Sequence, residues 1–235
     1  MNLYVGTSGY AYKEWKGLFY PEDLAEKRML HYYAGVFRSV EINNTFYRMP
    51  RESVLEQWRA EVPPEFRFVL KAPQRITHQQ RLKDAGDSVA YLFKVAGTLQ
   101  DRLGPVLFQL PPYLKKDFPL LRDFLQLLPQ GCRAAFEFRS RSWFDDDVIG
   151  LLKERGAVLC FAETDDGIEV PFLATGPFGY LRLRRSDYGD AELARWAKRV
   201  KDQRWSEAFI FFKHEDEARA PQLAKRFREL AGEAG

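Results

Sequence analysis

The sequence predicts a single (β/α)8 barrel of the TIM type that covers residues 1–235 and has an irregular sixth crossover. A chain of 235 residues lies within the range in which such a barrel forms one domain. Eight short runs rich in β-branched and aromatic residues alternate with stretches that have apolar residues at helical spacing. Strands that alternate with helices favour right-handed crossovers and a parallel sheet, and eight such units match a closed barrel.

The predicted elements follow one another at short intervals. The strands cover residues 3–5, 39–42, 66–70, 106–109, 134–138, 158–161, 180–183 and 209–212. Amphipathic periods between or after them lie at residues 54–58, 89–96, 118–125, 148–152, 193–200 and 223–230. The connection from Glu163 to Phe178 contains two prolines and no helical period, so we expect an irregular loop there. No repeat or low-complexity linker marks a second domain.

The loop after the first strand argues against an open, doubly wound sheet. Such a sheet would carry a dinucleotide fingerprint here, but residues 6–10 (GTSGY) lack its third glycine and do not lead promptly into a helix. We therefore favour the barrel and predict no cofactor.

Composition narrows the class of protein. Hydrophobic residues make up 46% of the chain and charged residues 29%, as in folded globular proteins. The formal net charge of +3 is too small to make the whole surface a polyanion-binding face, so any anion site must be local. The sequence predicts no membrane span and no targeting signal. It predicts that Cys132 and Cys160 are buried reduced thiols. We expect a cytoplasmic protein with no membrane partner, and the sequence makes no prediction of its oligomeric state.

Polar residues close nearly every predicted strand. In a barrel of this kind the active site lies at the carboxyl ends of the strands, so these residues are site candidates. Solvation of the strand ends is the alternative explanation for any one of them. The residues are Thr7, Ser8, Glu41, Asn43, Lys71, Gln109, Glu137, Arg139, Glu163, Arg182, Arg184, Lys213 and His214.

The alternation of side chains along a strand places some of these residues on a shared face. The pairs are Glu41 with Asn43, Glu137 with Arg139, and Arg182 with Arg184. Glu41 and Glu137 lie between large apolar residues and would be partly buried, where an unpaired charge is unfavourable. We therefore predict that four residues meet in one pocket at the carboxyl end, where their salt bridges would serve either structure alone or a functional site. They are Glu41, Lys71, Glu137 and Arg182.

Longer motifs occur in order along the chain. They are residues 6–10 (GTSGY) with Trp15, Gly17, Phe19, Tyr20 and Pro21, then 40–48 (VEINNTFYR), 68–71 (FVLK), Thr77-His78, 109–112 (QLPP), and 137–139 (EFR) with 142–144 (SWF). Together they resemble the motifs of domain-of-unknown-function family 72, also called the YecE-like family, and they span most of the chain. The resemblance implies the same barrel fold and supplies no established reaction.

The chain departs from the family's pattern at three places. Ser140 stands where a histidine is usual after Glu-Phe-Arg. In the family pattern, a strand that carries arginine is followed by His-Gly, and this chain has Arg184-Arg185 there instead. The last strand of the family pattern ends on Asn-Asn-Asp, and this chain has Lys213-His214-Glu215. These departures imply a diverged or altered-substrate member whose site is more basic than the family pattern.

An excess of positive charge is predicted at the mouth of the barrel. The cations are Lys71, Arg139, Arg182, Arg184 and Lys213, and the carboxylates are Glu41, Glu137 and Glu163. Five cations and three carboxylates leave two positive charges, and such an excess in a concave site attracts anions. We expect a phosphate-bearing ligand, either a nucleic acid or a sugar phosphate, held chiefly by Arg139, Arg182 and Lys213.

The sequence leaves other functions open, and it does not establish whether the protein is an enzyme. Glu41 and Glu137 could act as acid and base on a sugar. A metal-dependent hydrolase could use Glu41, His78, Glu137, Glu163 and Asp165, but no HExxH or similar spacing connects the histidines, and we predict no metal. A binding protein without chemistry is the remaining class.

Residues at the strand ends and on the adjoining loops are the predicted site residues. Aromatic residues on the loops could stack on a base or sugar ring, or could pack the loops; they are Tyr10, Trp15, Phe46, Tyr47 and Trp143. We predict catalytic roles for Glu41, Lys71 and Glu137. We predict ligand contacts from Thr7, Ser8, Tyr10, Trp15, Asn43, Tyr47, His78, Gln109, Arg139, Trp143, Arg182, Arg184 and Lys213.

Overall fold

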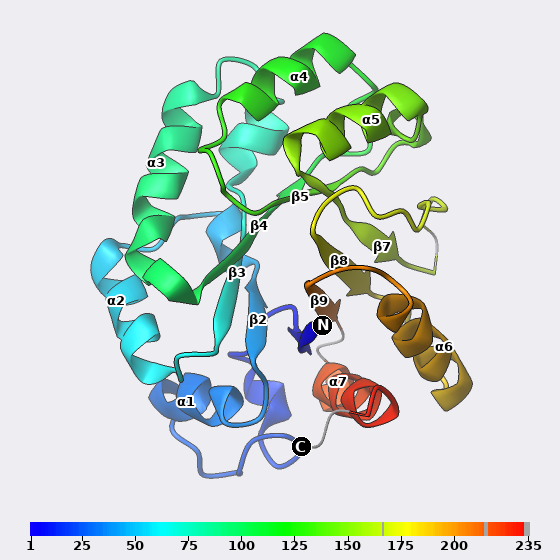
Figure 1. Ribbon diagram of the computed structural model, residues 1–235. Helices are drawn as coiled ribbons and strands as arrows, with labels where there is room; N and C mark the ends of the chain where they lie inside the picture. The colour runs from blue at the N-terminus through cyan, green and yellow to red at the C-terminus, as the bar shows by residue number, and fades with distance from the viewer. Residues whose placement is uncertain (166, 214–215, 233–235) are drawn as a thin grey trace.

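Parallel strands surrounded by helices form the centre of the protein in the computed structural model (Figure 1). The structure describes residues 1–165, 167–213 and 216–232. The described strands are β1 (Asn2–Thr7), β2 (Ser39–Ile42), β3 (Arg67–Lys71), β4 (Leu103–Gln109), β5 (Ala134–Glu137), β6 (Val158–Leu159), β7 (Phe161–Glu163), β8 (Phe178–Leu183) and β9 (Glu207–Phe212). Each of the runs predicted as strands coincides with one of them, except that Cys160 divides the sixth run into β6 and β7.

The helices lie on the outer side of the strands (Figure 1). They are α1 (Met29–Ala34), α2 (Glu52–Glu61), α3 (Gly86–Ala96), α4 (Phe118–Gln126), α5 (Asp146–Arg155), α6 (Asp190–Lys201) and α7 (Arg219–Leu230). The shorter helical turns that matter for the site are η1 (Lys13–Trp15), η3 (Asn44–Phe46), η4 (Arg75–Gln79) and η6 (Arg141–Trp143). The predicted amphipathic periods coincide with α2 to α7, whereas the six residues of α1 are too few to show a helical period.

Local signals in the sequence determine where α4 and α5 begin and end. The Asp117 side chain accepts a hydrogen bond from the Leu120 amide at 3.0 Å, and the Asp145 side chain accepts one from the Val148 amide at 3.1 Å. Each aspartate thereby satisfies a backbone donor that has no partner within its helix. Helix α5 ends at Gly156, whose φ of 64° lies in the left-handed region that favours glycine.

The strands form two parallel sheets, in the orders β1-β9-β8-β7 and β2-β3-β4-β5-β6. At one junction of the sheets, β1 and β2 are joined by an isolated parallel bridge between Ser8 and Glu41. At the other, the Cys160 amide between β6 and β7 donates to the Phe136 carbonyl at 2.8 Å. The structure thus establishes an α/β fold with parallel sheets. A closed barrel is not detected in the described strands, because pairing between β1 and β2 is reduced to that bridge and the sixth run is interrupted.

Side chains from both sheets share one interior core. Its members are Tyr4, Val69, Leu107, Ala135, Val158, Cys160, Phe178, Tyr180, Phe209 and Phe211. The rings of Tyr4 and Phe209 are stacked with centroids 4.7 Å apart. Because side chains alternate along a strand, the residues two positions beyond these apolar ones point to the same interior at the carboxyl ends. The same alternation therefore places five polar residues together at the carboxyl ends of the strands, next to the core: Lys71, Gln109, Glu137, Arg182 and Lys213.

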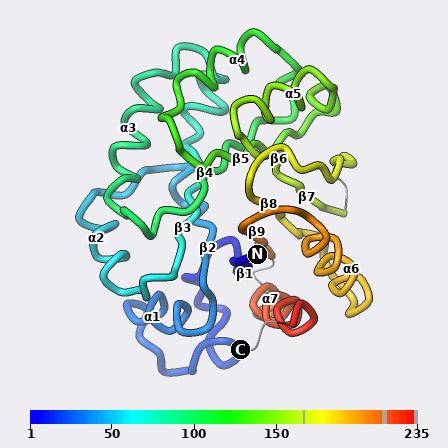
Figure 2. The backbone as a smooth tube through the Cα atoms, in the orientation of Figure 1, coloured from blue at the N-terminus to red at the C-terminus, as the bar shows by residue number. Residues whose placement is uncertain are grey.

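The connection between β7 and β8 has no helix in its described part, residues 164–165 and 167–177, as the sequence predicts (Figure 2). The Thr175 side chain joins this connection to β6 and to the residue that precedes β6. Its hydroxyl accepts a hydrogen bond from the Leu159 amide at 2.7 Å and donates one to the Ala157 carbonyl at 3.0 Å. Two buried backbone groups beside β6 therefore depend on one threonine side chain.

None of the described helices is long and apolar enough to cross a membrane.

Candidate functional site

Arg182 on β8 forms salt bridges with two carboxylates from two other strands. Its Nη2 atom lies 2.8 Å from Oε1 of Glu41 on β2, and its Nη1 atom donates to Oε2 of Glu137 on β5. The three side chains are almost completely buried, with exposures of 1% for Arg182, 0% for Glu41 and 2% for Glu137. We call Glu41, Glu137 and Arg182 the central ion cluster. It links β8 of one sheet to β2 and β5 of the other.

Further donors surround the Glu41 carboxylate. It accepts hydrogen bonds from the Ser8 hydroxyl at 2.8 Å, the Tyr180 hydroxyl at 2.6 Å and the Asn43 amide at 3.3 Å. Burial acts to raise the pKa of Glu41, but the attraction of Arg182 and these hydrogen bonds hold it below its ordinary value. Glu41 is therefore an ionised acceptor at neutral pH.

The Glu137 carboxylate has a similar environment. It accepts hydrogen bonds from the Gln109 amide at 2.6 Å and from Nε of Arg139 at 2.9 Å, besides the bond from Arg182. Burial acts to raise its pKa, but Arg182 and Arg139 outweigh it and hold the pKa well below the ordinary value. A carboxylate in this state is a poor proton donor, so neither member of the Glu41–Glu137 pair has the raised pKa of a general acid.

A cavity of about 500 Å³ lies over the central ion cluster at the carboxyl ends of the strands. We call it the mouth cavity. Five cations reach its lining from four strands or their ends, and they are accompanied by amide and aromatic side chains. The lining residues are Tyr12, Asn43, Asn44, Phe46, Tyr47, Lys71, His78, Gln109, Arg139, Arg182, Arg184 and Lys213.

Lys71 is a cation of the mouth cavity whose pKa is strongly lowered. Burial lowers its pKa to about 8, assisted by the positive charge of Arg182 and opposed by Glu137 and Glu41. Its Nζ atom lies 4.1 Å from the ring centroid of Phe46. No salt bridge joins it to a carboxylate in the described part of the chain. The amine thus changes its charge close to physiological pH.

Arg184 and His78 are two further groups of the cavity whose pKa is lowered. The pKa of Arg184 is lowered by burial and by Arg182, and its Nε atom is buried without a hydrogen-bond partner among the described residues. Burial and the charge of Lys71 lower the pKa of His78, so that its ring is neutral at pH 7. The His78 Nδ1 atom lies 2.9 Å from the Thr77 hydroxyl. The buried Nε donor of Arg184 is thus unsatisfied within the described structure.

A neighbouring side cavity of about 540 Å³ adjoins the mouth cavity. Arg139 and Arg184 line both of them, so these two guanidinium groups form the boundary between the cavities. The side cavity is otherwise lined by Pro112, Glu137, Phe138, Ala162, Thr164, Asp165, Gly167, Ile168 and Val170.

Eight of the predicted ligand contacts line the mouth cavity, and five do not. Ser8 contacts Glu41 instead. Thr7 is fully buried and donates its hydroxyl to the Gly9 carbonyl, and the half-buried Tyr10 ring packs beside Tyr33. The side chains that line the cavity are Asn43, Tyr47, His78, Gln109, Arg139, Arg182, Arg184 and Lys213.

The two tryptophans are structural in this fold. Trp15 is 1% exposed and packs against Tyr20, and Trp143 is 0% exposed and stacks on Phe138 at 4.9 Å between centroids. The Trp143 indole also donates to the Leu114 carbonyl at 2.8 Å. Their expected role as stacking surfaces for a ligand does not agree with this burial, because loop packing takes up both faces of the rings.

Glu163 does not face the mouth of the barrel as expected. Glu163 belongs to the opposite face of its strand from Ala162, which packs on the interior core, and its charge acts on Tyr188 instead of on the mouth. His214 and Glu215 lie outside the described residues. The described residues contain no group of three or more His, Cys, Asp or Glu side chains arranged to hold a metal.

Three contributors were not predicted from the sequence: Tyr180, Tyr12 and Asn44, the last of which lines the mouth cavity next to Asn43. Tyr180 donates to Glu41, and its place two residues before Arg182 on the same strand face was the available signal. Tyr12 lines the mouth cavity and donates its hydroxyl to the Ser8 carbonyl at 2.7 Å, but it lies in a loop where no periodicity indicates its direction.

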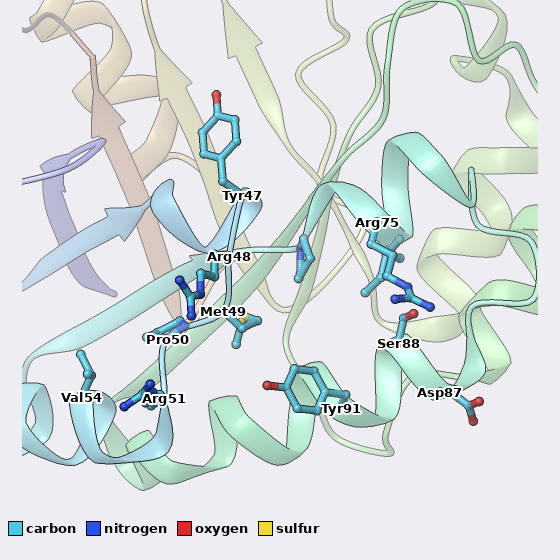
Figure 3. Close-up of a pocket in the computed structure, with 12 residues that line it drawn as sticks. Tyr47, Arg48, Met49, Pro50, Arg51, Val54, Arg75, Asp87, Ser88 and Tyr91 are labelled. Atoms are coloured by element: carbon cyan, nitrogen blue, oxygen red, sulfur yellow. The ribbon is translucent and has the colours of Figure 1, made fainter.

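A larger cavity of about 910 Å³ lies beside the mouth cavity, next to α2 and α3 (Figure 3). We call it the arginine groove. Tyr47 lines both this groove and the mouth cavity. The full lining is Tyr47, Arg48, Met49, Pro50, Arg51, Val54, Pro73, Arg75, Ile76, Asp87, Ser88 and Tyr91.

These observations define an α/β protein of parallel sheets with a basic cavity over a buried ion cluster at the strand ends. The chain belongs to the family described as protein of unknown function DUF72, whose model matches residues 4–235. This confirms the resemblance to the YecE-like family.

Known relatives agree with that assignment. The chain is 30% identical over 166 residues to the UPF0759 protein YunF of Bacillus subtilis (strain 168), covering 66% of this chain and 58% of YunF. It is 30% identical over 143 residues to the UPF0759 protein YecE of Escherichia coli (strain K12), covering 60% of this chain and 50% of YecE. The matches thus span 58% of the length of YunF and 50% of the length of YecE.

Solved structures have the same fold. A DUF72 family protein from Thermotoga maritima is 26% identical, with a TM-score of 0.88 over 99% of this chain and 100% of that one. A DUF72 family protein from Enterococcus faecalis has a TM-score of 0.80 over 99% of this chain and 96% of that one. The second is 17% identical, and its likeness concerns the fold alone.

Proposed function

We propose that the mouth cavity binds a phosphate-bearing ligand. The observation that carries this proposal is the charge balance of the cavity. Apart from Lys213, four cations line it, and the carboxylates that contact these four among the described residues are Glu41 and Glu137, which leaves two positive charges when all of these groups are ionised. A positive excess in a concave site of low dielectric constant attracts anions more strongly than the same charges on an open surface.

The cations that contact the phosphate differ from those expected from the sequence. Arg182 is 1% exposed, and both of its terminal nitrogens are bonded to carboxylates, so it holds the cluster together. Arg139 keeps 40% of its side chain exposed, and the Arg184 Nε atom has no partner among the described residues. We assign the phosphate contacts to Arg139, Arg184 and Lys213, with Lys71 as a further cation below pH 8.

The position of these residues supports the proposal. We propose that the two sheets complete one TIM-like barrel over the chain, which is favoured by the Ser8–Glu41 bridge, the one-residue interruption at Cys160 and the shared interior core. TIM barrels often hold phosphate at the loops after the seventh and eighth strands. Arg184 and Lys213 directly follow β8 and β9, which would be those strands.

A binding protein without chemistry is the second candidate. It is favoured by the saturation of Glu41 and Glu137, each of which already accepts three or more hydrogen bonds. Acid–base chemistry by this carboxylate pair has correspondingly less support, because neither group is protonated near neutral pH.

The test is calorimetric titration with matched compounds that differ by one phosphate: ribose and ribose 5-phosphate, glucose and glucose 6-phosphate, and a nucleoside and its monophosphate. The proposal predicts binding of the phosphorylated member and at least about tenfold weaker binding of its partner, because a charge-assisted contact contributes about 1.5–3 kcal/mol. Equal affinities within each pair contradict the proposal. Recovery of the ligand unchanged after long incubation would favour the binding protein over the enzyme.

A further inference from the structure

The arginine groove and the mouth cavity are lined by the same segments of the chain and share Tyr47. The segment after β2 supplies Asn43 and Phe46 to the mouth cavity and then Arg48 and Arg51 to the groove, with Tyr47 lining both. The segment after β3 likewise supplies Lys71 and His78 to the mouth cavity, and supplies Pro73, Arg75 and Ile76 to the groove between them. A long ligand could therefore occupy both without crossing an intervening element.

The groove is basic. Arg48, Arg51 and Arg75 are exposed, and in the part of the chain that the structure describes none of them forms an ion pair with an acidic side chain. Asp87 is the acidic residue in the lining, and it lies at the end of the groove away from Arg48 and Arg51 (Figure 3). Three guanidinium groups that contact no carboxylate create a local excess of positive charge, while the whole chain carries only +3.

Aromatic rings accompany these cations. Tyr47 is 73% exposed and Tyr91 is 56% exposed, whereas a ring of the core such as Tyr33 is 0% exposed. The floor beside them is apolar and is formed by Met49, Pro50, Val54, Pro73 and Ile76. Exposed rings next to guanidinium groups match the stacking surface and basic channel by which proteins bind single strands of nucleic acid. A duplex would not offer its base faces to these rings, because they are stacked inside it.

We propose that the arginine groove binds a single-stranded nucleic acid whose bases stack on Tyr91 and Tyr47, and whose backbone runs along Arg48, Arg51 and Arg75 into the mouth cavity. This inference rests on the proposed function, because the mouth cavity receives one phosphate of the strand. It specifies the ligand as a nucleic acid instead of a sugar phosphate, which would leave the groove empty.

The experiment measures fluorescence anisotropy of labelled oligothymidylates of about 4 and about 12 nucleotides. The intact protein is compared with Tyr91→Ala, Arg51→Ala, Arg184→Met and the conservative variant Tyr91→Phe. Arg195→Ala is the matched control, because Arg195 is an exposed arginine on α6, on the other side of the molecule (Figure 1). Thermal unfolding checks that each variant is folded.

The proposal predicts that the longer strand binds more tightly than the shorter one. Tyr91→Ala should weaken it at least about fivefold, whereas Tyr91→Phe and Arg195→Ala should bind as the intact protein does. Arg51→Ala should reduce the slope of log affinity against log salt by about 0.7, the value for one phosphate of a single strand.

Three results would overturn the inference. The first is equal affinity for both lengths, or no effect of Tyr91→Ala and Arg51→Ala, while ribose 5-phosphate still binds; the proposed function then survives alone. The second is binding of polyglutamate that depends on Arg51 and not on Tyr91, which would indicate an acidic protein partner. The third is strand binding that depends on Tyr91 but not on Arg184, which contradicts the phosphate site of the mouth cavity.

Discussion

The guanidinium of Arg182 lies between the carboxylates of Glu41 and Glu137 and donates one terminal nitrogen to each. This arrangement connects the two sheets through their buried side chains, since β8 belongs to one sheet and β2 and β5 to the other. It also fixes the direction of the strand ends that supply the mouth cavity. We therefore assign a structural role to the cluster, and we propose that the surrounding cations bind the anion.

Replacing Arg182 by methionine should destabilise the protein by about 3–5 kcal/mol, because two buried carboxylates lose their shared partner. Urea unfolding measures this change. The triple variant Glu41→Gln/Arg182→Met/Glu137→Gln should recover at least about 2 kcal/mol of the loss, since it leaves no buried charge. Arg195→Ala, on the surface of α6, should change the free energy of unfolding by less than about 0.5 kcal/mol. A loss below about 1 kcal/mol for Arg182→Met would show that the ion pairs do not hold the strands.

The same cluster predicts a loss of stability in acid. The pKa values of Glu41 and Glu137 are lower in the folded protein than their ordinary value of 4.5, so the unfolded chain binds more protons as the pH falls. Their contribution is complete above about pH 4.5 and declines below it. Urea unfolding between about pH 5 and about pH 3 should show a steeper decline for the intact protein than for the triple variant. Parallel curves for the two proteins would mean that other carboxylates dominate acid unfolding.

The lowered pKa of Lys71 predicts that the affinity for anions decreases as the pH rises above neutrality. Its pKa of about 8 means that its positive charge is lost as the pH rises through that value. The affinity for pyrophosphate should therefore fall between about pH 7 and about pH 9, and Lys71→Met should bind more weakly at pH 7 with a flatter profile. Calorimetry across this range tests the prediction, and an identical pH profile for the Lys71→Met variant would contradict it.

The lowered pKa of Lys71 also affects folding, with a defined sign. The folded protein binds fewer protons than the unfolded chain between pH 8 and the ordinary lysine value of 10.5. This residue alone should make the free energy of unfolding rise with pH across that window. The difference in stability between the intact protein and Lys71→Met, measured at about pH 7.5 and about pH 10, should change in that direction. A difference that is constant with pH would argue against the shift.

Thr175 provides a test of the irregular connection between β7 and β8. Thr175→Val should cost about 1–3 kcal/mol, because the Leu159 amide and the Ala157 carbonyl lose their buried partner. Thr175→Ser keeps the hydroxyl and should lose much less. A larger loss for Thr175→Ser than for Thr175→Val in thermal unfolding would contradict this account, because valine keeps a methyl group and lacks the hydroxyl.

The strands and the central ion cluster could be predicted from the sequence because both follow from simple periodicities. β-Branched and aromatic runs gave the strands. Two-residue alternation and the common direction of parallel strands placed Glu41, Glu137 and Arg182 at one end. The same alternation, applied from Cys160 through Ala162, would have directed Glu163 away from the mouth cavity.

The aromatic loops and the arginine groove could not be predicted in this way. Composition does not distinguish a loop tryptophan that is buried, such as Trp15, from a loop tyrosine that is exposed, such as Tyr47. The groove is assembled from the segments before α2 and after β3 and from the surface of α3, and their relative positions arise from tertiary packing. Arg75 and Tyr91 are neighbours only once those segments have docked.

The most direct test of the phosphate site is a calorimetric titration of pyrophosphate into the intact protein and into Arg184→Met at about pH 7. Arg184 lines both the mouth and side cavities and has a buried Nε atom without a partner among the described residues. The account predicts binding to the intact protein and at least about tenfold weaker binding to the folded variant, the equivalent of about 1.4 kcal/mol. Equal affinities, or no binding to the intact protein, would contradict a phosphate site in the mouth cavity.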